Sequence, residues 1–142
     1  MESPFLLQLQ RGLQGEKISS ESLRGALVSV DHLLTQLAQD LQIVYDGPNV
    51  GLGSQADLHR LRIANHHWTG AEHAWGVAVC SYAGKGEPRS EWRIHRVSRE
   101  RLPIILQALP AFFHGYHTAA EGAHPERAST RRLGEISRLF NA

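Results

Sequence analysis

The clearest pattern in the chain is a stripe of apolar residues in alternating steps of four and three positions. This spacing places side chains on one face of a helix, and it predicts a helix that is capped by Ser19 or Ser20. The helix should end near Tyr45, before the helix-breaking residues 46–49. Two structures fit the stripe: a helix that packs on the chain's own sheet, and a helix that pairs with a second copy in a homodimer. The stripe residues are Leu23, Leu27, Val30, Leu34, Leu37, Leu41 and Val44.

Apolar residues at helical spacing also predict helices at both ends of the chain. The first covers about residues 4–14 and ends at Gly15. A helical stretch over 99–121 contains Pro110, which should kink or split it because proline cannot donate the interior backbone hydrogen bond. A last helix is predicted over about residues 125–140, with its apolar residues on one side.

Segments rich in β-branched and aromatic residues lie between these helices, and they predict strands over 57–67, 73–82 and 90–97. If the first hairpin pairs Ile63 with Val77, the apolar side chains fall on one face of the sheet. A matching register in the second hairpin places Trp92 beside Val79 and makes Trp92 and Ile94 core residues. The sequence therefore predicts an α+β fold, with a three-stranded antiparallel sheet flanked by N-terminal and C-terminal helices in the order α-α-β-β-β-α-α.

Length and composition are typical of one folded domain. The 142 residues are 42% hydrophobic and 20% charged, with a formal net charge of +1. We expect a single domain over residues 1–142, because a chain of this length can bury a sizeable core. No apolar run is long enough to span a membrane, and the N-terminus lacks the features of a signal peptide. We therefore expect no membrane partner. Since Cys80 is the only cysteine, no intramolecular disulfide can form, and we expect a cytoplasmic protein.

The charge is uneven, and basic side chains gather in the predicted sheet. Residues 1–56 hold three basic and six acidic residues, whereas residues 57–142 hold twelve basic and eight acidic residues. In the predicted registers, one sheet face has a floor of small residues, Gly76, Ala78 and Cys80. Small residues admit a polymer backbone, arginines pair with phosphate, and aromatic rings stack on bases. The candidate nucleic-acid-binding residues around this floor are Arg60, Arg62, Arg93, His95 and Trp68.

The same pattern also has a structural interpretation. Arginines are common on the solvated face of an antiparallel sheet, and a floor of small residues fits close packing under a helix. Burying the arginines would require partners for their charges, so we expect this face to be at least partly open. The first functional hypothesis is a non-enzymatic protein that binds nucleic acid. The alternative is a regulatory homodimer formed by the helix from Leu23 to Val44.

Nine histidines raise the possibility of metal binding or catalysis. His67 should face His73 across the first hairpin. His114 and His117 are three residues apart, but the glutamate of the metalloprotease motif is missing beside them. The neighbours of Cys80 give no sign of an activated thiol, so we expect a buried structural thiol. The sequence therefore predicts no metal site, no cofactor and no catalytic residues, although it does not exclude an enzyme.

Overall fold

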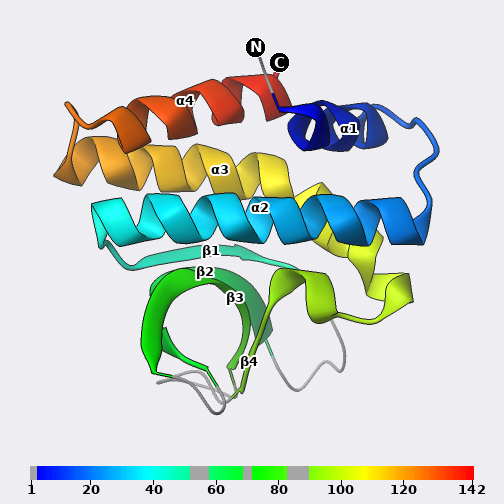
Figure 1. The fold of residues 1–142 in the computed structure, drawn as a ribbon, viewed down its shortest axis with the longest axis horizontal. Helices are drawn as coiled ribbons and strands as arrows, with labels where there is room; N and C mark the ends of the chain where they lie inside the picture. Colours follow the sequence, from blue (N-terminus) through cyan, green and yellow to red (C-terminus); the bar gives the residue numbers. More distant parts are fainter. Residues whose placement is uncertain (1–2, 52–57, 69–71, 83–89) are drawn as a thin grey trace.

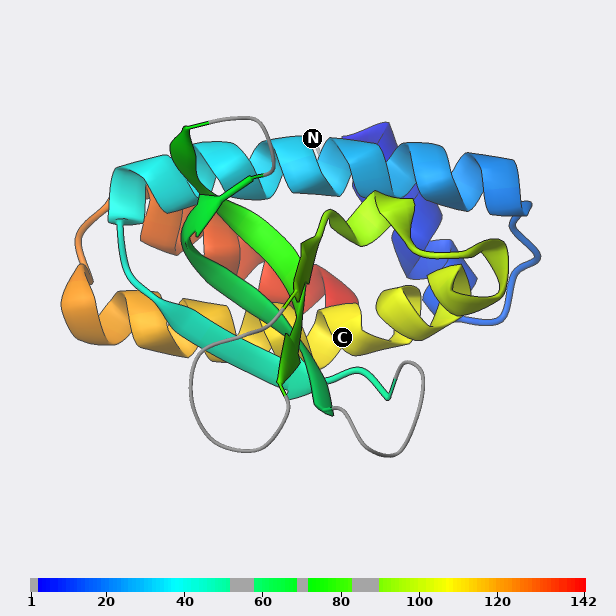
Figure 2. The same cartoon turned by 90° about the horizontal axis from the view of Figure 1, so that it is seen from below.

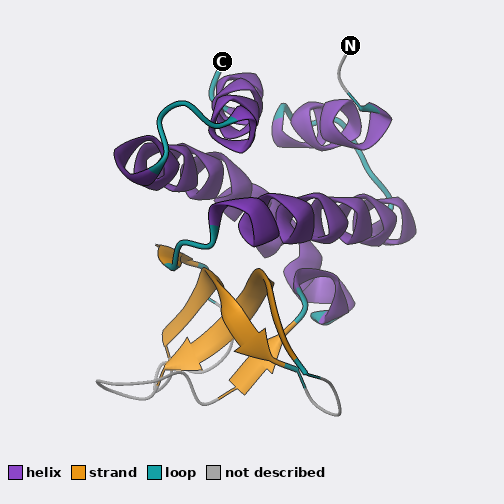
Figure 3. Ribbon diagram, turned by 60° about the vertical axis from the view of Figure 1, so that its left-hand side comes forward, coloured by secondary structure: helices purple, strands orange, loops and turns teal. Residues whose placement is uncertain are grey.

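The computed structural model describes residues 3–51, 58–68, 72–82 and 90–142. It is an α+β fold with helices at both ends of the chain, which confirms the predicted fold class. The elements in chain order are α1 (Pro4–Leu13), α2 (Ser20–Leu41), β1 (Tyr45–Asn49), β2 (Leu58–His67), β3 (His73–Tyr82), β4 (Ser90–Trp92), the 3-10 helices η1 (Ile94–Arg96) and η2 (Arg99–Arg101), α3 (Leu102–Ala123) and α4 (Ala128–Phe140). In Figure 1, α1 and α4 form the outer layer, and α2 and α3 lie between them and the sheet. Figure 3 shows the same separation of helices and strands from another side.

The described strands form one antiparallel sheet in the order β1-β2-β3-β4. β2 and β3 pair in the predicted register, with Ile63 opposite Val77, and β4 places Trp92 opposite Val79. The side chains of Ile63, Val77 and Val79 are fully buried in the core that joins the sheet to the helices. The alternation of apolar residues therefore predicts the pairing of both hairpins correctly.

β1 is an additional edge strand that the sequence analysis did not predict. It contains Gly47 and Pro48, which are typical of turns. Proline is tolerated at the edge of a sheet, and the pairing of β1 with β2 is irregular. A Cβ atom at Gly47 would lie 2.7 Å from the carbonyl oxygen of Leu61 and 2.8 Å from the ring of Phe112. The absence of a side chain therefore allows β1 to lie closely against β2 and α3.

The third predicted strand, residues 90–97, is shorter than expected. β4 ends at Trp92, whose side chain is 43% exposed and is therefore not a core residue. Ile94 is buried as predicted, but it lies in η1, after the strand has ended. Figure 2 shows the chain running from β4 through η1 and η2 alongside α2. Polar contacts to α2, described below, hold this part of the chain against that helix.

The apolar stripe of α2 packs inside the chain's own core. Its residues from Leu23 to Leu41 are buried among the sheet and the other helices. Of the two predicted caps, Ser19 and Ser20, the structure uses Ser19, whose hydroxyl accepts a hydrogen bond from the Ser22 amide. The helix ends at Leu41 rather than near Tyr45, because Gln42 adopts a left-handed φ of 51°. Of the two interpretations of the stripe, the structure supports packing within one chain. Self-association stays a prediction, and it would need another surface.

Pro110 was predicted to kink or split this helix, and α3 is not split, since it continues through the proline. Its first turns run obliquely to the rest of the helix in Figure 1. Leu109 and Phe112, on either side of the proline, are both buried and hold the helix against the core. α4 begins at Ala128, slightly later than predicted. Within the described ranges, none of the helices combines the length and the apolar character that crossing a membrane requires.

Candidate nucleic-acid interface

The small-residue floor of the predicted binding face is buried. Ala78 and Cys80 have no exposed surface, and Gly76 is buried beside them. β2 and β3 curl strongly below α2 in Figure 1, so the inner side of the sheet turns toward itself. A Cβ atom at Gly76 would lie 4.0 Å from the Trp68 ring, which in turn packs on the buried ring of His66 at a centroid distance of 5.2 Å. A polymer backbone cannot reach this floor, and the expectation of an open face is wrong at its centre.

Two of the five predicted binding residues, Arg60 and Arg62, make contacts that stabilise the β1 edge of the sheet. The Nε atom of Arg62 lies 3.6 Å from the Asp46 carboxylate, and its Nη1 donates to the Tyr82 hydroxyl at 3.4 Å. Tyr82 donates to Asp46 at 2.9 Å, and burial together with this bond raises the pKa of Tyr82 to about 12. Arg60 donates to the Gly47 carbonyl oxygen at 3.3 Å. Both guanidinium groups therefore help to hold β1 on the sheet.

The other three predicted residues meet at a carboxylate that the sequence analysis did not single out. Asp31 in α2 is 5% exposed, and its Oδ2 accepts from Arg93 Nη1 at 3.2 Å and from His95 Nε2 at 3.3 Å. The Arg93 guanidinium lies 4.3 Å from the centre of the Trp68 ring, in a cation–π geometry. Burial lowers the pKa of His95, Asp31 partly opposes this, and Arg93 and Arg96 lower it further. The lowered pKa favours the neutral form of His95, which places its Nε2 3.3 Å from the Asp31 carboxylate.

A cleft of about 390 Å³ opens beside this carboxylate and is named here the Asp31 cleft. Trp68 and Trp75 supply aromatic walls, and Arg93 and Arg96 supply positive charge. Asp31 could not be identified from the sequence because a polar residue within a long helix gives no sign of its tertiary partners. Arg96 was not among the predicted residues because, in a strand over 90–97, it would share a face with the apolar residues Trp92 and Ile94.

Residues 92–101, named here the arginine segment, carry the basic side chains next to the cleft. Arg96 and Arg101 are exposed, and their side chains have no hydrogen-bond or ion-pair partner among the described residues. The density of arginine in this stretch is a sequence signal that could have identified it. The segment reads Trp92-Arg93-Ile94-His95-Arg96-Val97-Ser98-Arg99-Glu100-Arg101.

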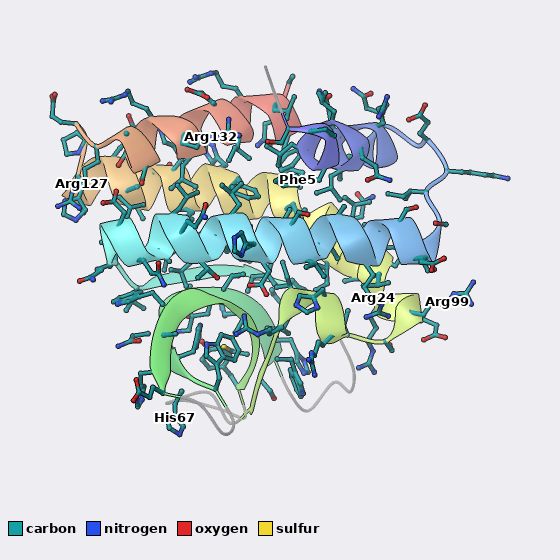
Figure 4. All side chains as sticks on the ribbon, in the orientation of Figure 1. Phe5, Arg24, His67, Arg99, Arg127 and Arg132 are labelled. Carbon is teal, nitrogen blue, oxygen red and sulfur yellow. The ribbon has the colours of Figure 1, made fainter. Side chains whose placement is uncertain are left out.

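Two further arginines fix the backbone of the arginine segment to α2. Arg24 donates from Nη1 to the carbonyl oxygens of His95 and Val97, the second at 3.0 Å. Arg99 donates to the Ser20 hydroxyl at 3.1 Å. Figure 4 shows Arg24 and Arg99 at the same end of α2, where both border a surface hollow. The exposed side chains of the segment therefore project from a fixed support.

Among the described residues, the histidines and Cys80 form no cluster comparable to the arginine segment. The predicted pair across the first hairpin is present, with the ring centroids of His67 and His73 4.5 Å apart. His117 lies 3.6 Å from the Glu121 carboxylate on the same helix. Cys80 is buried, as expected of a structural thiol. Among the residues that the structure describes, no group of three or more histidine, cysteine, aspartate or glutamate side chains is placed to hold a metal ion.

The chain matches no protein-family model, no curated protein and no solved structure. Its function must therefore be argued from its own side chains, and the arginine segment is the described surface on which unpartnered cations and an exposed aromatic ring occur together.

Proposed function

We propose that the protein binds single-stranded nucleic acid along the arginine segment. The observation that supports this most directly is the position of Arg96 and Arg101, which are exposed, have no side-chain partner among the described residues and border the same hollow as Trp92. Arginine pairs with phosphate oxygens, and an exposed indole gives a base a face on which to stack. The binding surface therefore lies beyond the end of β4 rather than on the floor of the sheet.

The Asp31 cleft extends this surface. Arg96 borders both the cleft and the hollow beside Trp92, so one side chain connects the two. A strand held at Arg96 can place one base near Trp92 and a neighbouring nucleotide at the cleft, where Trp75 supplies a further aromatic wall. This path uses Arg93 and His95 in a supporting role, since Asp31 already occupies them.

A single strand fits this surface better than a duplex does. Base faces are hidden inside a duplex, whereas single-stranded bases are open to stacking on side chains. The segment also consists of two short 3-10 turns rather than a helix that could enter a groove.

Fluorescence anisotropy with labelled single-stranded and double-stranded DNA and RNA oligonucleotides tests the proposal. We expect single strands to bind more tightly than duplexes, and binding to weaken steeply as salt rises. Each arginine that contacts a phosphate should contribute about 0.7 to the slope of log affinity against log salt. The double variant Arg96→Ala/Arg101→Ala should therefore lose about 1.4 of that slope.

The matched control is Arg138→Ala. Arg138 is also exposed and without a partner among the described residues, but it lies on α4, on the side of the helices away from the sheet in Figure 1. It removes one positive charge where the double variant removes two, and it should leave the slope nearly unchanged rather than lowering it by about 0.7. Equal losses of this slope in both variants would show that binding depends only on general charge, and they would overturn the proposal. So would the absence of single-strand binding at about 50 mM salt.

Two further expectations accompany this proposal. A lone, buried cysteine is compatible with the expected location in the cytoplasm. Homodimer formation would present two arginine segments to one strand and raise the affinity through multivalency. Light scattering over a concentration series tests the second expectation without depending on the first.

A further inference from the structure

The hollow beside Trp92 is separate from the Asp31 cleft, since Asp31 is not among its lining residues. Its volume is about 190 Å³, and it is named here the His59 hollow. Trp92 and His59 form its aromatic part, with ring centroids 5.8 Å apart and an angle of 25° between the rings. Its described lining residues include no carboxylate and are His59, Trp92, Arg96, Val97, Ser98 and Arg101.

His59 is an unsatisfied polar group inside this hollow. Its side chain is 8% exposed, and its Nδ1 atom is buried without a hydrogen-bond partner among the described residues. Burying a polar atom without a partner is unfavourable, and such atoms in native structures are uncommon. This unsatisfied Nδ1, on a residue that lines a hollow with two exposed arginines, indicates a place where a polar ligand completes the hydrogen bonding.

The size and chemistry of the hollow select the ligand. Pockets for drug-sized molecules usually have volumes of roughly 300–1,000 Å³. The His59 hollow is smaller than these, so it has room for one planar ring, and a charged group attached to that ring must lie outside it, at the exposed guanidinium groups of Arg96 and Arg101. Trp92 offers a flat apolar face, and Arg96 and Arg101 together attract a doubly charged anion.

We propose that the His59 hollow binds a single nucleotide unit, with its phosphate held by Arg96 and Arg101 and its base against Trp92. This inference rests on the proposed function, because it identifies the point at which a strand is held most closely. The ring of His59 packs beside Trp92 and offers its unsatisfied Nδ1 to the ligand. A ligand with both a phosphate and a base therefore binds better than one with either part alone.

Titration with adenosine 5′-monophosphate, adenosine and inorganic phosphate, followed by tryptophan fluorescence, tests this site. We expect the monophosphate to quench the emission, and adenosine and phosphate to bind at least about tenfold more weakly. In Trp92→Phe, which keeps an aromatic face but removes this fluorophore, the quenching should disappear although Trp68 and Trp75 remain. Quenching that persists in Trp92→Phe places the nucleotide elsewhere and overturns the inference.

Substitutions on the hollow provide the second readout. Arg101→Ala should weaken binding of the monophosphate by about tenfold, as the loss of one charge-assisted contact does. His59→Phe keeps the stacked ring and removes both nitrogens, and it should also weaken binding. Arg138→Ala is the matched control and should bind as the natural chain does. Thermal unfolding of each variant separates lost binding from lost folding, and unchanged affinity in a folded Arg101→Ala protein contradicts the site.

The same titrations distinguish this inference from the proposed function. If labelled oligonucleotides bind but the monophosphate neither quenches Trp92 nor competes with them up to about 1 mM, the hollow is not the holding point and the proposed function stands. If the monophosphate binds in the hollow but no oligonucleotide binds, the proposed function fails and the hollow remains a mononucleotide site. If neither binds, both are wrong.

Discussion

Arg62 in β2 and Arg96 in η1 differ in what surrounds their guanidinium groups. Arg62 is mostly buried and reaches both Asp46 and Tyr82. Arg96 is exposed, and no described residue pairs with it. Arg62 therefore belongs to the β1 edge, by which we mean the contacts among Asp46, Gly47, Arg60, Arg62 and Tyr82. Arg96 is available to a ligand.

The difference comes from where the acidic residues lie. β1 brings Asp46 directly opposite Arg62 in the sheet. Asp31 satisfies Arg93 and His95 but leaves the next arginine in the segment without a carboxylate. Basic residues that look alike in a sequence can therefore differ in their partners. Arg62 is neutralised beside β1, whereas Arg96, which follows β4, has no partner among the described residues.

The most severe way to disturb the β1 edge is to add a side chain at Gly47. In Gly47→Ala the new Cβ would lie 2.7 Å from the Leu61 carbonyl oxygen, and a backbone atom in a central strand cannot move aside easily. We expect a loss of about 2–3 kcal/mol in the free energy of unfolding, measured in urea. The control is Gly25→Ala in α2, where a Cβ meets nothing within 4 Å. That change should be neutral or stabilise the protein by up to about 1 kcal/mol.

In the other region, Asp31→Ala should weaken the attachment of the arginine segment to α2. Removing this buried carboxylate leaves Arg93 and His95 without their shared acceptor. Breaking a buried ion pair costs roughly 3–5 kcal/mol, but Arg93 is partly exposed to solvent, so we expect about 2 kcal/mol.

Asp40→Ala is the matched control for this carboxylate. Asp40 lies on the same helix and pairs with Arg127 at 3.4 Å, but both side chains are about half exposed. Its removal should cost less than about 0.5 kcal/mol in the same urea experiment. Similar losses for the two aspartates would show that Asp31 does not anchor the segment.

A pair of single arginine variants sharpens the comparison directly. Arg62→Ala should lower the free energy of unfolding by about 1 kcal/mol, because its hydrogen bond and ion pair at the β1 edge are lost. It should leave oligonucleotide affinity unchanged. Arg101→Ala should change stability by less than about 0.5 kcal/mol and weaken oligonucleotide binding by about tenfold. If Arg62→Ala weakens binding as much as Arg101→Ala does, the division between the two regions is wrong.

The parts of the fold that could be predicted are those that apolar spacing determines. The α2 stripe, the register of Ile63 with Val77 and the cap at Ser19 all follow from local patterns, and the structure contains each of them. β1 could not be predicted in this way. Its glycine and proline are typical of a turn, and they become a strand only because β2 and α3 lie on either side.

The candidate site was harder to predict because its geometry depends on long-range polar contacts. The density of basic residues is visible in the sequence, but which of them are neutralised is not. Asp31 and Arg93 are far apart along the chain, and their contact forms directly after β4 has ended. The small residues of β3 gave a false indication of an open floor, since a sheet that curls strongly needs small residues on its inner side.

The smallest expected effect concerns pH at the anchor of the arginine segment. Burial lowers the pKa of His95, and the charges that face it are those of Asp31, Arg93 and Arg96. Because the pKa is lower in the folded protein, the unfolded chain takes up the proton first as pH falls. The contribution of His95 to stability is therefore complete above about pH 6.5 and decreases as pH drops below that value.

Urea unfolding at about pH 7.5 and about pH 5.5 measures this contribution in the natural chain and in His95→Gln. Glutamine keeps a donor for Asp31 but does not titrate, so the variant should lose less stability between the two values than the natural chain loses. His114→Gln, at an exposed position on α3, is the control and should lose as much as the natural chain. The effect should be smaller than the others because Asp31 partly offsets the burial of the charged ring. If His95→Gln and the natural chain lose the same stability, His95 is not held neutral against Asp31, and the anchor rests on Arg93 and Arg24 alone.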